Sequence, residues 1–200
     1  MAVSLVILLH GVGSGGADLA PLADHLAPFL PNAAFEAPDG PEPFDQGGLG
    51  RQWFSISGVT EAYRAGRIAA ARPPFDAVLT ALTERHGLSG HPERVALAGF
   101  SQGAIMALDA IASGRWRPGA VVGFSGRLAM QDPLAPSPGT RVLLLHGTAD
   151  PVIPATEARS AHGRLSAAGA DISLSLLPGL GHSISREGLD LAAAHLAKLP

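Results

Sequence analysis

Short apolar runs alternate with longer runs of helical periodicity along most of this chain. The apolar runs predict strands at Ser4–Leu9, Ala33–Ala37, Val95–Gly99, Ala120–Phe124, Val142–His146 and Ile172–Leu177. The periodic runs predict helices at Ala17–Leu30, Thr60–Ala71 with a continuation after Pro73-Pro74 to His86, Gln102–Ala112, Thr156–Ala168 and Ser185–Leu199. Repeated strand–helix alternation predicts an α/β fold with a mostly parallel central sheet and helices on both faces. The run Val142–His146 is apolar throughout, which indicates an inner strand, whereas Ile172–Leu177 alternates and indicates an edge strand.

One stretch departs from this pattern. Pro38–Gly58 is rich in Gly and Pro, predicts no regular element and contains Trp53-Phe54. Loops of this length in a compact domain are usually functional or mobile. The connection from Gly126 to Thr140 is too short for a lid domain, so we expect an open and shallow site.

Length, charge and the content of cysteine and histidine exclude several classes of protein. The 200 residues predict one α/β domain over positions 1–200. The net charge is −3 and Lys and Arg form no cluster, so neither nucleic acid nor an anionic membrane is expected as a partner. The absence of cysteine excludes disulfides, thiolate catalysis and Cys-ligated metals. The histidines show no ligand-like clustering, so a metal site is not expected.

The apolar N-terminal stretch resembles a signal peptide only in its hydrophobicity. It lacks a basic segment, and its apolar part covers only Val3 to Leu9, so we interpret it as a buried strand. No apolar run approaches the ~18 residues of a transmembrane helix. We therefore expect a cytoplasmic protein without membrane insertion, and the sequence leaves its oligomeric state open.

The most informative motif is Gly99-Phe100-Ser101-Gln102-Gly103, which lies between a predicted strand and a predicted helix. A Gly-x-Ser-x-Gly in that context is the nucleophile elbow of α/β-hydrolases. The sharp turn strains the serine backbone and leaves no room for side chains two residues away on either side. The alternative is a glycine-rich turn without chemistry, because the pentapeptide is short and glycine is abundant in this chain.

A serine nucleophile needs a base and a group that orients the base. Asp150 follows the strand that ends at His146, and His182 follows the strand that ends at Leu177. The order Ser, acid, His, with each group just past a strand, is the order of this fold. The alternatives are a turn-forming Asp150 and a surface His182. Two other acids, at positions 132 and 171, are weaker candidates because neither directly follows a predicted strand.

Two backbone amides are expected to bind the oxyanion of the tetrahedral intermediate. One is the N–H of Gln102, at the start of the helix after the nucleophile. The other is the N–H of Val12, in the glycine-rich turn after the first strand. The same turn could be read as a dinucleotide-binding motif at Gly11–Gly16, but that reading does not account for the serine, acid and histidine.

Several segments in sequence order resemble one known family. They are Leu8–Gly13, Gln52-Trp53-Phe54, Gly99–Ala104, Phe124–Leu128, His146–Pro154 and Gly181–Ile184. Together they span almost the whole chain, which is similar to the bacterial carboxylesterase/phospholipase branch of the α/β-hydrolases, the group that includes acyl-protein thioesterases. The resemblance implies Ser101, Asp150 and His182 as nucleophile, acid and base, and Val12 and Gln102 as the oxyanion hole.

The chain also departs from that family. Its first strand follows the N-terminus almost directly, so we expect the family's initial antiparallel hairpin to be shortened or absent. Ser55 follows Trp53-Phe54 where the thioesterase branch commonly has an acidic residue, which bears on thioester specificity. Trp53 and Phe54 are candidates to line an acyl pocket; the alternative is that they anchor the long loop to the body of the protein.

The sequence thus predicts a serine hydrolase that cleaves carboxylic esters through an acyl-enzyme on Ser101, without a cofactor. Small-molecule esters or thioesters are the expected substrates, and lysophospholipids are a further candidate. Two alternatives stay open at this point. One is a peptidase or amidase that uses the same triad, and the other is a binding module that kept the fold without turnover.

Overall fold

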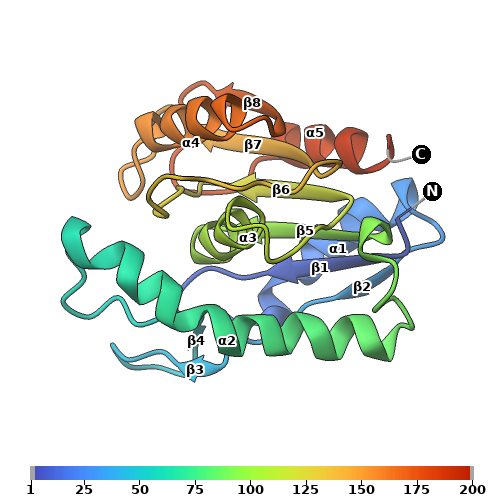
Figure 1. Cartoon of the computed structure of the whole chain (residues 1–200), viewed down its shortest axis with the longest axis horizontal. Helices are drawn as coiled ribbons and strands as arrows, with labels where there is room; N and C mark the ends of the chain where they lie inside the picture. The colour runs from blue at the N-terminus through green and yellow to red at the C-terminus, as the bar shows by residue number, and fades with distance from the viewer. Residues whose placement is uncertain (1–2, 199–200) are drawn as a thin grey trace.

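A computed structural model describes residues 3–198 of the chain. Its centre is a six-stranded sheet in the order β2-β1-β5-β6-β7-β8, and every neighbouring pair in this sheet is parallel (Figure 1). The strands are β1 Leu5–Leu9, β2 Ala34–Glu36, β5 Val95–Phe100, β6 Ala120–Phe124, β7 Arg141–Gly147 and β8 Asp171–Leu177. The six predicted strands are therefore confirmed, with ends that shift by at most one residue.

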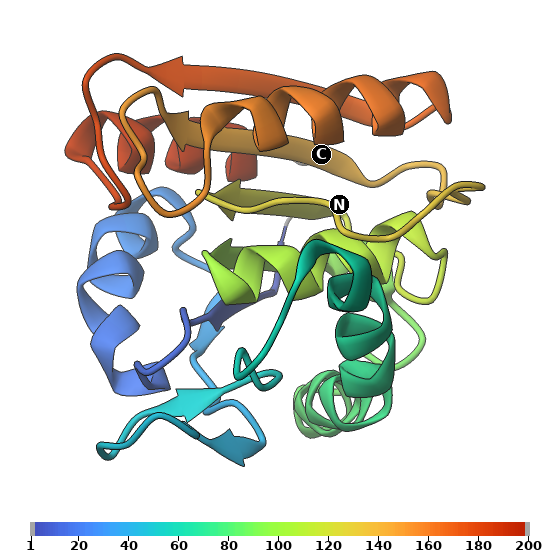
Figure 2. The same cartoon turned by 90° about the vertical axis from the view of Figure 1, so that its left-hand side faces the viewer.

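Helices cover both faces of the sheet. The α-helices are α1 Ala20–Leu26, α2 Glu61–Arg85, α3 Gln102–Ala112, α4 Ala155–Ala167 and α5 Arg186–Leu196. Helices α1 and α5 pack on one face, and α2, α3 and α4 on the other (Figure 2). This arrangement confirms the α/β-hydrolase fold expected from the sequence. The predicted end of the last helix at Leu199 lies outside the described residues.

The hydrophobic core has two layers because side chains alternate across each strand. On β1, Leu5, Ile7 and Leu9 pack under α2 and α3, while Val6 and Leu8 pack under α1 and α5. All five side chains are completely buried, as an inner parallel strand requires. Strand β8 lies at the edge of the sheet and is only partly buried, which confirms the meaning of its alternating pattern.

Proline changes two predicted helices in opposite ways. The region predicted as one helix over Ala17–Leu30 is a 3-10 turn at Gly16–Leu19, then α1, then a second 3-10 turn at Ala27–Phe29. Pro28 has no N–H to continue the α-helical ladder, so α1 ends before it.

In α2, by contrast, the helix runs without a break through Pro73 and Pro74. Its ribbon bends along its length (Figure 1), which is the expected effect of proline inside a helix. Ile68, Phe75 and Leu79 are buried before and after the prolines, and their packing on the sheet holds the helix together.

The long stretch predicted as irregular contains a small antiparallel hairpin. Its strands are β3 Glu42–Pro43 and β4 Arg51–Gln52. An isolated bridge between Ser14 and Arg51 joins this hairpin to the turn after β1. The long loop is therefore attached to the same end of the sheet as the predicted site.

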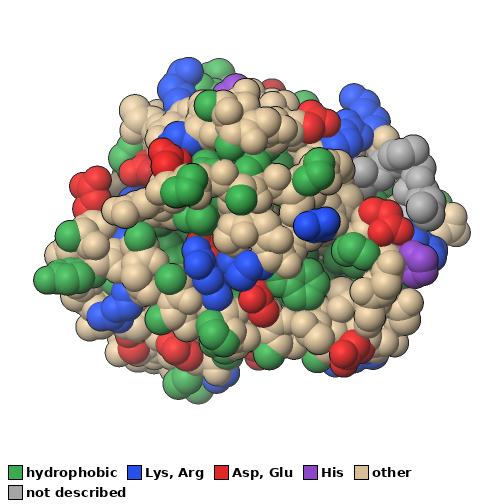
Figure 3. All heavy atoms as spheres, viewed as in Figure 1, with side chains coloured by type: hydrophobic (Ala, Val, Ile, Leu, Met, Phe, Trp, Pro, Cys, Tyr) green, Lys and Arg blue, Asp and Glu red, His purple; other side chains and the backbone are tan. Residues whose placement is uncertain are grey.

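Charge is mixed on the face that carries α2, α3 and α4. Acidic and basic side chains are interspersed there, without a wide area of one sign (Figure 3). Within residues 3–198, no helix has the length and apolar character needed to cross a lipid bilayer.

Candidate active site

Ser101 occupies a strained turn between β5 and α3. Its backbone has φ 52° and ψ −111°, a region that residues other than glycine rarely adopt. A Cβ atom on Gly99 would lie 2.5 Å from the N of Ala104, and one on Gly103 would lie 2.1 Å from the carbonyl O of Leu9. Only glycine fits at these two positions, as the tight turn implied. The Ser101 N–H donates to the Phe124 carbonyl at 2.9 Å, which fixes the turn to β6.

The three predicted side chains form one hydrogen-bonded relay. Ser101 Oγ lies 3.0 Å from His182 Nε2, and His182 Nδ1 lies 2.8 Å from Asp150 Oδ2. The Phe100 ring packs against the imidazole with its centroid 4.9 Å away. Because Nδ1 donates to the carboxylate, Nε2 is free to accept the serine proton. The structure thus brings together three groups that are far apart in the sequence.

Asp150 is held as a carboxylate inside the protein. Its side chain is completely buried, and its Oδ1 accepts the N–H groups of Val152 at 2.8 Å and Ile153 at 2.9 Å. Burial by itself raises the pKa of this carboxyl, but the hydrogen bonds from His182, Ile153 and Val152 outweigh burial and lower the pKa below its ordinary value. The buried His146 also lies beside this carboxylate: its Nε2 is 3.3 Å from Asp150 Oδ2 and donates to the Ile153 carbonyl at 2.8 Å.

The loops after β7 and β8 are fastened to each other, which holds the acid and the base in register. Ala149 N–H donates to the Leu180 carbonyl at 3.0 Å, and Gly179 N–H donates to Thr148 Oγ1 at 2.9 Å. A Cβ atom on Gly147 would lie 2.1 Å from the Leu180 carbonyl O, so the two chains cross there at backbone contact. The Asp150–His182 geometry therefore depends on close packing of two loops.

The two amides expected to bind an oxyanion lie at the same cavity as Ser101. Val12 and Gln102 both line it. Gln102 is the first residue of α3, where amides have no acceptor within the helix. Among residues 3–198, no acceptor is found for the Val12 N–H. Both amides are thus available to an oxygen atom placed beside Ser101.

His10 fixes the turn that carries Val12. Its Nδ1 donates to the Gly11 carbonyl at 2.7 Å, and its Nε2 accepts the Gly40 N–H at 2.8 Å. Burial lowers the pKa of His10 more than its hydrogen bond to Gly11 raises it. The imidazole is therefore kept neutral, which the bond from Gly40 requires.

The side chain of Gln102 has a structural role that sequence reasoning missed. Its Oε1 accepts the Trp53 N–H and its Nε2 donates to the Phe54 carbonyl, each at 2.7 Å. This fully buried amide attaches the long loop to the nucleophile elbow. No local pattern could reveal the contact, because its partners are backbone groups of the long loop and do not follow a predicted strand.

Trp53 and Phe54 have different roles: one anchors the long loop, and the other lines the cavity beside Ser101. Trp53 is 1% exposed, donates from Nε1 to the His10 carbonyl at 3.0 Å and packs edge-on against Phe75. It anchors the loop and does not line the cavity beside Ser101. Phe54 does line that cavity.

The cavity beside Ser101 has a volume of about 240 Å³. Its lining combines aliphatic and aromatic side chains with two guanidinium groups. The lining residues are Val12, Phe54, Ile56, Val59, Arg64, Ser101, Gln102, Ile105, Arg127, Val152 and Ile153. Because this volume lies just below the usual range for ligand sites, the cavity fits a small substrate.

Comparison with known proteins identifies the family of this chain. The model of the family described as Phospholipase/Carboxylesterase matches residues 2–200. The chain belongs to this family. It is 36% identical over 195 residues to "Esterase YpfH" of Escherichia coli (strain K12), an alignment that covers 98% of this chain and 82% of that protein. The family resemblance seen in the sequence is thereby confirmed, and the chain is a carboxylesterase-family hydrolase.

Two further relatives extend the comparison of this family member. The crystal structure of esterase PE8 superposes with a TM-score of 0.89 at 34% identity, covering 100% of this chain and 94% of that one. "Carboxylesterase SOBER1" of Arabidopsis thaliana is 28% identical over 208 residues, covering 94% of this chain and 87% of that protein. Within residues 3–198 no group of three or more His, Asp or Glu side chains is arranged to hold a metal ion.

Proposed function

We propose that this family member cleaves carboxylic esters through an acyl-enzyme on Ser101, with His182 as general base and Asp150 as the group that orients it. The supporting observation is the continuous relay from Ser101 Oγ to His182 Nε2 at 3.0 Å and from His182 Nδ1 to Asp150 Oδ2 at 2.8 Å, beside a cavity of about 240 Å³. These distances are within the range that a nucleophile and its base require.

In the first half-reaction, His182 takes the Ser101 proton while Oγ attacks the acyl carbonyl. The carbonyl π electrons move to oxygen, and the negative oxygen accepts hydrogen bonds from the amides of Val12 and Gln102. Collapse of this intermediate breaks the bond to the alcohol, which leaves with the proton from His182. Asp150 stabilises the imidazolium that exists between these two proton transfers.

In the second half-reaction, water replaces the alcohol. His182 removes a proton from this water as its oxygen attacks the Ser101 ester. The same two amides bind the second oxyanion, and collapse releases the carboxylic acid and restores Ser101. All atoms and protons balance with water as the only co-substrate, so the scheme requires no cofactor.

Substrates of limited size suit the cavity. A volume of about 240 Å³ lined by Phe54, Ile56 and Val59 favours short or medium acyl chains over long ones. Thioesters react through the same steps and are included in the proposal. A cytoplasmic location and a single domain over positions 1–200 stay predictions of the sequence.

The test is hydrolysis of p-nitrophenyl esters from acetate to dodecanoate by the wild-type protein and by Ser101→Ala. We expect turnover that is greatest for short or medium chains and that is lost in the variant. Labelling by a fluorophosphonate probe should follow the same pattern and should map to Ser101. Turnover of the p-nitroanilides of the same acids at rates similar to the esters would support the amidase alternative instead.

An inert Ser101 would contradict the proposal. If neither ester turnover nor probe labelling occurs in folded protein, the fold serves as a binding module. The matched control is Ser166→Ala, a serine in the last turn of α4 that lies outside the cavity. This variant should retain full turnover and labelling.

A further inference from the structure

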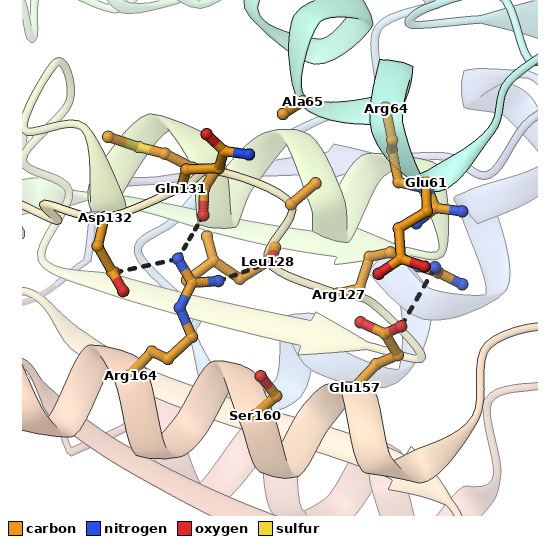
Figure 4. A pocket seen from close by; sticks show the side chains of 12 residues that line it. Glu61, Arg64, Ala65, Arg127, Leu128, Gln131, Asp132, Glu157, Ser160 and Arg164 are labelled. Atoms are coloured by element: carbon orange, nitrogen blue, oxygen red, sulfur yellow. Dashed lines mark hydrogen bonds and ion pairs between the residues drawn. The ribbon is translucent and has the colours of Figure 1, made fainter.

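Two arginines border the cavity beside Ser101. Arg64, from α2, and Arg127, from the loop after β6, also line a second and more polar cavity of about 390 Å³. Figure 4 shows this second cavity, with Arg64 and Arg127 grouped with Glu61 and Glu157 at one end and Arg164 with Asp132 at the other. The two guanidinium groups therefore lie where the two cavities meet.

Two neighbouring arginines make several hydrogen bonds with the protein itself. Arg164 donates to the carbonyls of Leu128 and Met130 and to Asp132, which fixes the loop that forms one wall of the polar cavity. Arg67 donates to the carbonyls of Ser55 and Ser57 in the long loop. These two side chains have a clear structural role.

Arg127 and Arg64 differ from that pattern. The Arg127 side chain is only 12% exposed, yet its single hydrogen bond within residues 3–198 runs from one nitrogen to Glu157 Oε1 at 3.3 Å. A guanidinium has five N–H donors, so most of those on Arg127 have no protein acceptor. For Arg64 no side-chain hydrogen bond or ion pair is found with the described residues.

The electrostatics of Arg127 fit this incomplete pairing. Burial has the largest effect on the pKa of Arg127 and lowers it. The nearby Glu157 carboxylate raises this pKa, and the like charge of Arg64 lowers it. Two guanidinium groups that repel each other and keep unused donors are an arrangement that a bound carboxylate relieves.

We propose that Arg64 and Arg127 bind a carboxylate carried by the substrate, so that the protein prefers esters with a second, ionised carboxyl group. This inference rests on the proposed ester hydrolysis and deepens it by assigning a substrate class. Ser101 and both arginines line one cavity of about 240 Å³, so one small molecule can reach the nucleophile and the guanidinium groups together.

The surrounding acids restrict the charge that this site accepts. Glu61 and Glu157 line the polar cavity beside the two arginines, and Asp132 lines its other end. The two guanidinium groups therefore provide N–H donors to a ligand, while the nearby carboxylates cancel much of their positive charge. A monoanionic carboxylate meets less repulsion here than a dianionic phosphate, so we assign a carboxylate.

The substrates for the test differ in one terminal group. Mono-p-nitrophenyl adipate carries a carboxylate, p-nitrophenyl hexanoate is its neutral counterpart, and p-nitrophenyl 5-phosphonopentanoate carries a phosphonate. A further pair, 4-acetoxybenzoate and 4-acetoxybenzamide, places the anionic or neutral group on the leaving alcohol instead. The measured quantity is the ratio of kcat/KM for the anionic substrate to that for the neutral one, after subtraction of spontaneous hydrolysis.

The variants are Arg64→Met and Arg127→Met, with Arg159→Met as a matched control. Arg159 is an exposed arginine on α4 that lines neither cavity, so its variant should leave the ratio unchanged. We expect the wild-type protein to prefer one carboxylate-bearing substrate over its neutral partner. Each cavity variant should lower that ratio about tenfold, the size of effect that loss of one charged hydrogen bond produces.

The outcomes separate this inference from the proposed function. Turnover of p-nitrophenyl hexanoate with an unchanged ratio in both variants overturns the inference and leaves the esterase proposal intact. Preference for the phosphonate overturns the assignment of a carboxylate. If Arg127→Met fails to fold, Arg64→Met decides, because its removal breaks no side-chain hydrogen bond or ion pair found among the described residues.

A binding measurement covers the case of an inert nucleophile. Monomethyl adipate is titrated by calorimetry into Ser101→Ala and into the same protein with Arg127→Met. We expect binding that weakens about tenfold in the double variant. Equal affinity in the two proteins contradicts the inference, whether or not esters are hydrolysed.

Discussion

Gln102 Oε1 accepts the backbone N–H of Trp53 at 2.7 Å, which joins the start of the helix after the nucleophile to the middle of the long loop. The same side chain donates to the Phe54 carbonyl, and Phe54 lines the cavity beside Ser101. One buried amide therefore couples the nucleophile elbow to a wall of the substrate cavity.

This contact predicts that Gln102→Leu destabilises the protein. A buried N–H and a buried carbonyl lose their partners, which should lower the free energy of unfolding by about 2–4 kcal/mol. Urea denaturation measures the change, and limited proteolysis should show earlier cleavage within positions 38–58. Gln131→Leu is the control, because Gln131 is exposed. Equal stability of the two variants would show that the hydrogen bonds from the Gln102 side chain contribute nothing to the free energy of unfolding.

Asp150→Asn should reduce kcat by on the order of 10³–10⁴-fold with little loss of binding. An amide cannot stabilise the imidazolium, and it favours the wrong imidazole tautomer. The controls are Asp132→Asn and Asp171→Asn, the two other acids considered from the sequence. Asp132 contacts Arg164 and Asp171 contacts Arg141, so both variants should stay close to wild type in ester hydrolysis. A reversal of this order would assign the acid elsewhere.

His10 predicts a loss of stability on mild acidification. Burial holds its pKa below the ordinary value of 6.5, so the unfolded chain binds this proton first as the pH falls. The contribution of His10 is therefore complete above pH 6.5 and is lost as the pH falls toward its folded-state pKa. Protonation also removes the Nε2 acceptor that the Gly40 N–H needs.

The measurement for His10 is urea denaturation between pH 7.5 and 5. The slope per proton is about 1.4 kcal/mol per pH unit. His10→Gln should show a shallower dependence than wild type. Burial also lowers the pKa of His195, so His195→Gln is compared to separate the two contributions. If His10→Gln retains the full wild-type slope, the imidazole is not the group that titrates.

Two glycine-to-alanine substitutions should have opposite effects. In Gly103→Ala, the new methyl group would lie 2.1 Å from the Leu9 carbonyl O, which should cost about 3 kcal/mol or more and displace Ser101. In Gly163→Ala, inside α4, no atom beyond its two chain neighbours and the nearby backbone of the same helix lies within 4 Å of the new methyl group. That variant should gain roughly 0.5–1 kcal/mol from helix propensity. Thermal denaturation and ester turnover check both, and a well-folded, active Gly103→Ala would contradict the close approach.

Local sequence patterns were sufficient to predict the strands, the nucleophile elbow and the meeting of the three proposed catalytic side chains. Apolar runs identify strands because each strand is buried through its own side chains, and the alternation in Ile172–Leu177 identifies the edge strand for the same reason. The Gly99–Gly103 motif identifies the elbow because its constraint is local, and parallel strands then bring the residues at their ends to one edge. The meeting of Ser101, Asp150 and His182 was thus predictable from strand ends and their order.

Contacts that do not involve residues at strand ends could not be predicted in this way. The bond from Trp53 to Gln102 spans 49 residues, and the juxtaposition of Arg64 with Arg127 depends on how α2 packs beside the loop after β6. Helix α2 continues through Pro73 and Pro74 because its buried face packs on the sheet, against the local preference of proline. The pattern of apolar and polar residues indicates which side chains each segment buries. The hydrogen-bond partner of a polar group is determined only by how the segments pack together in three dimensions.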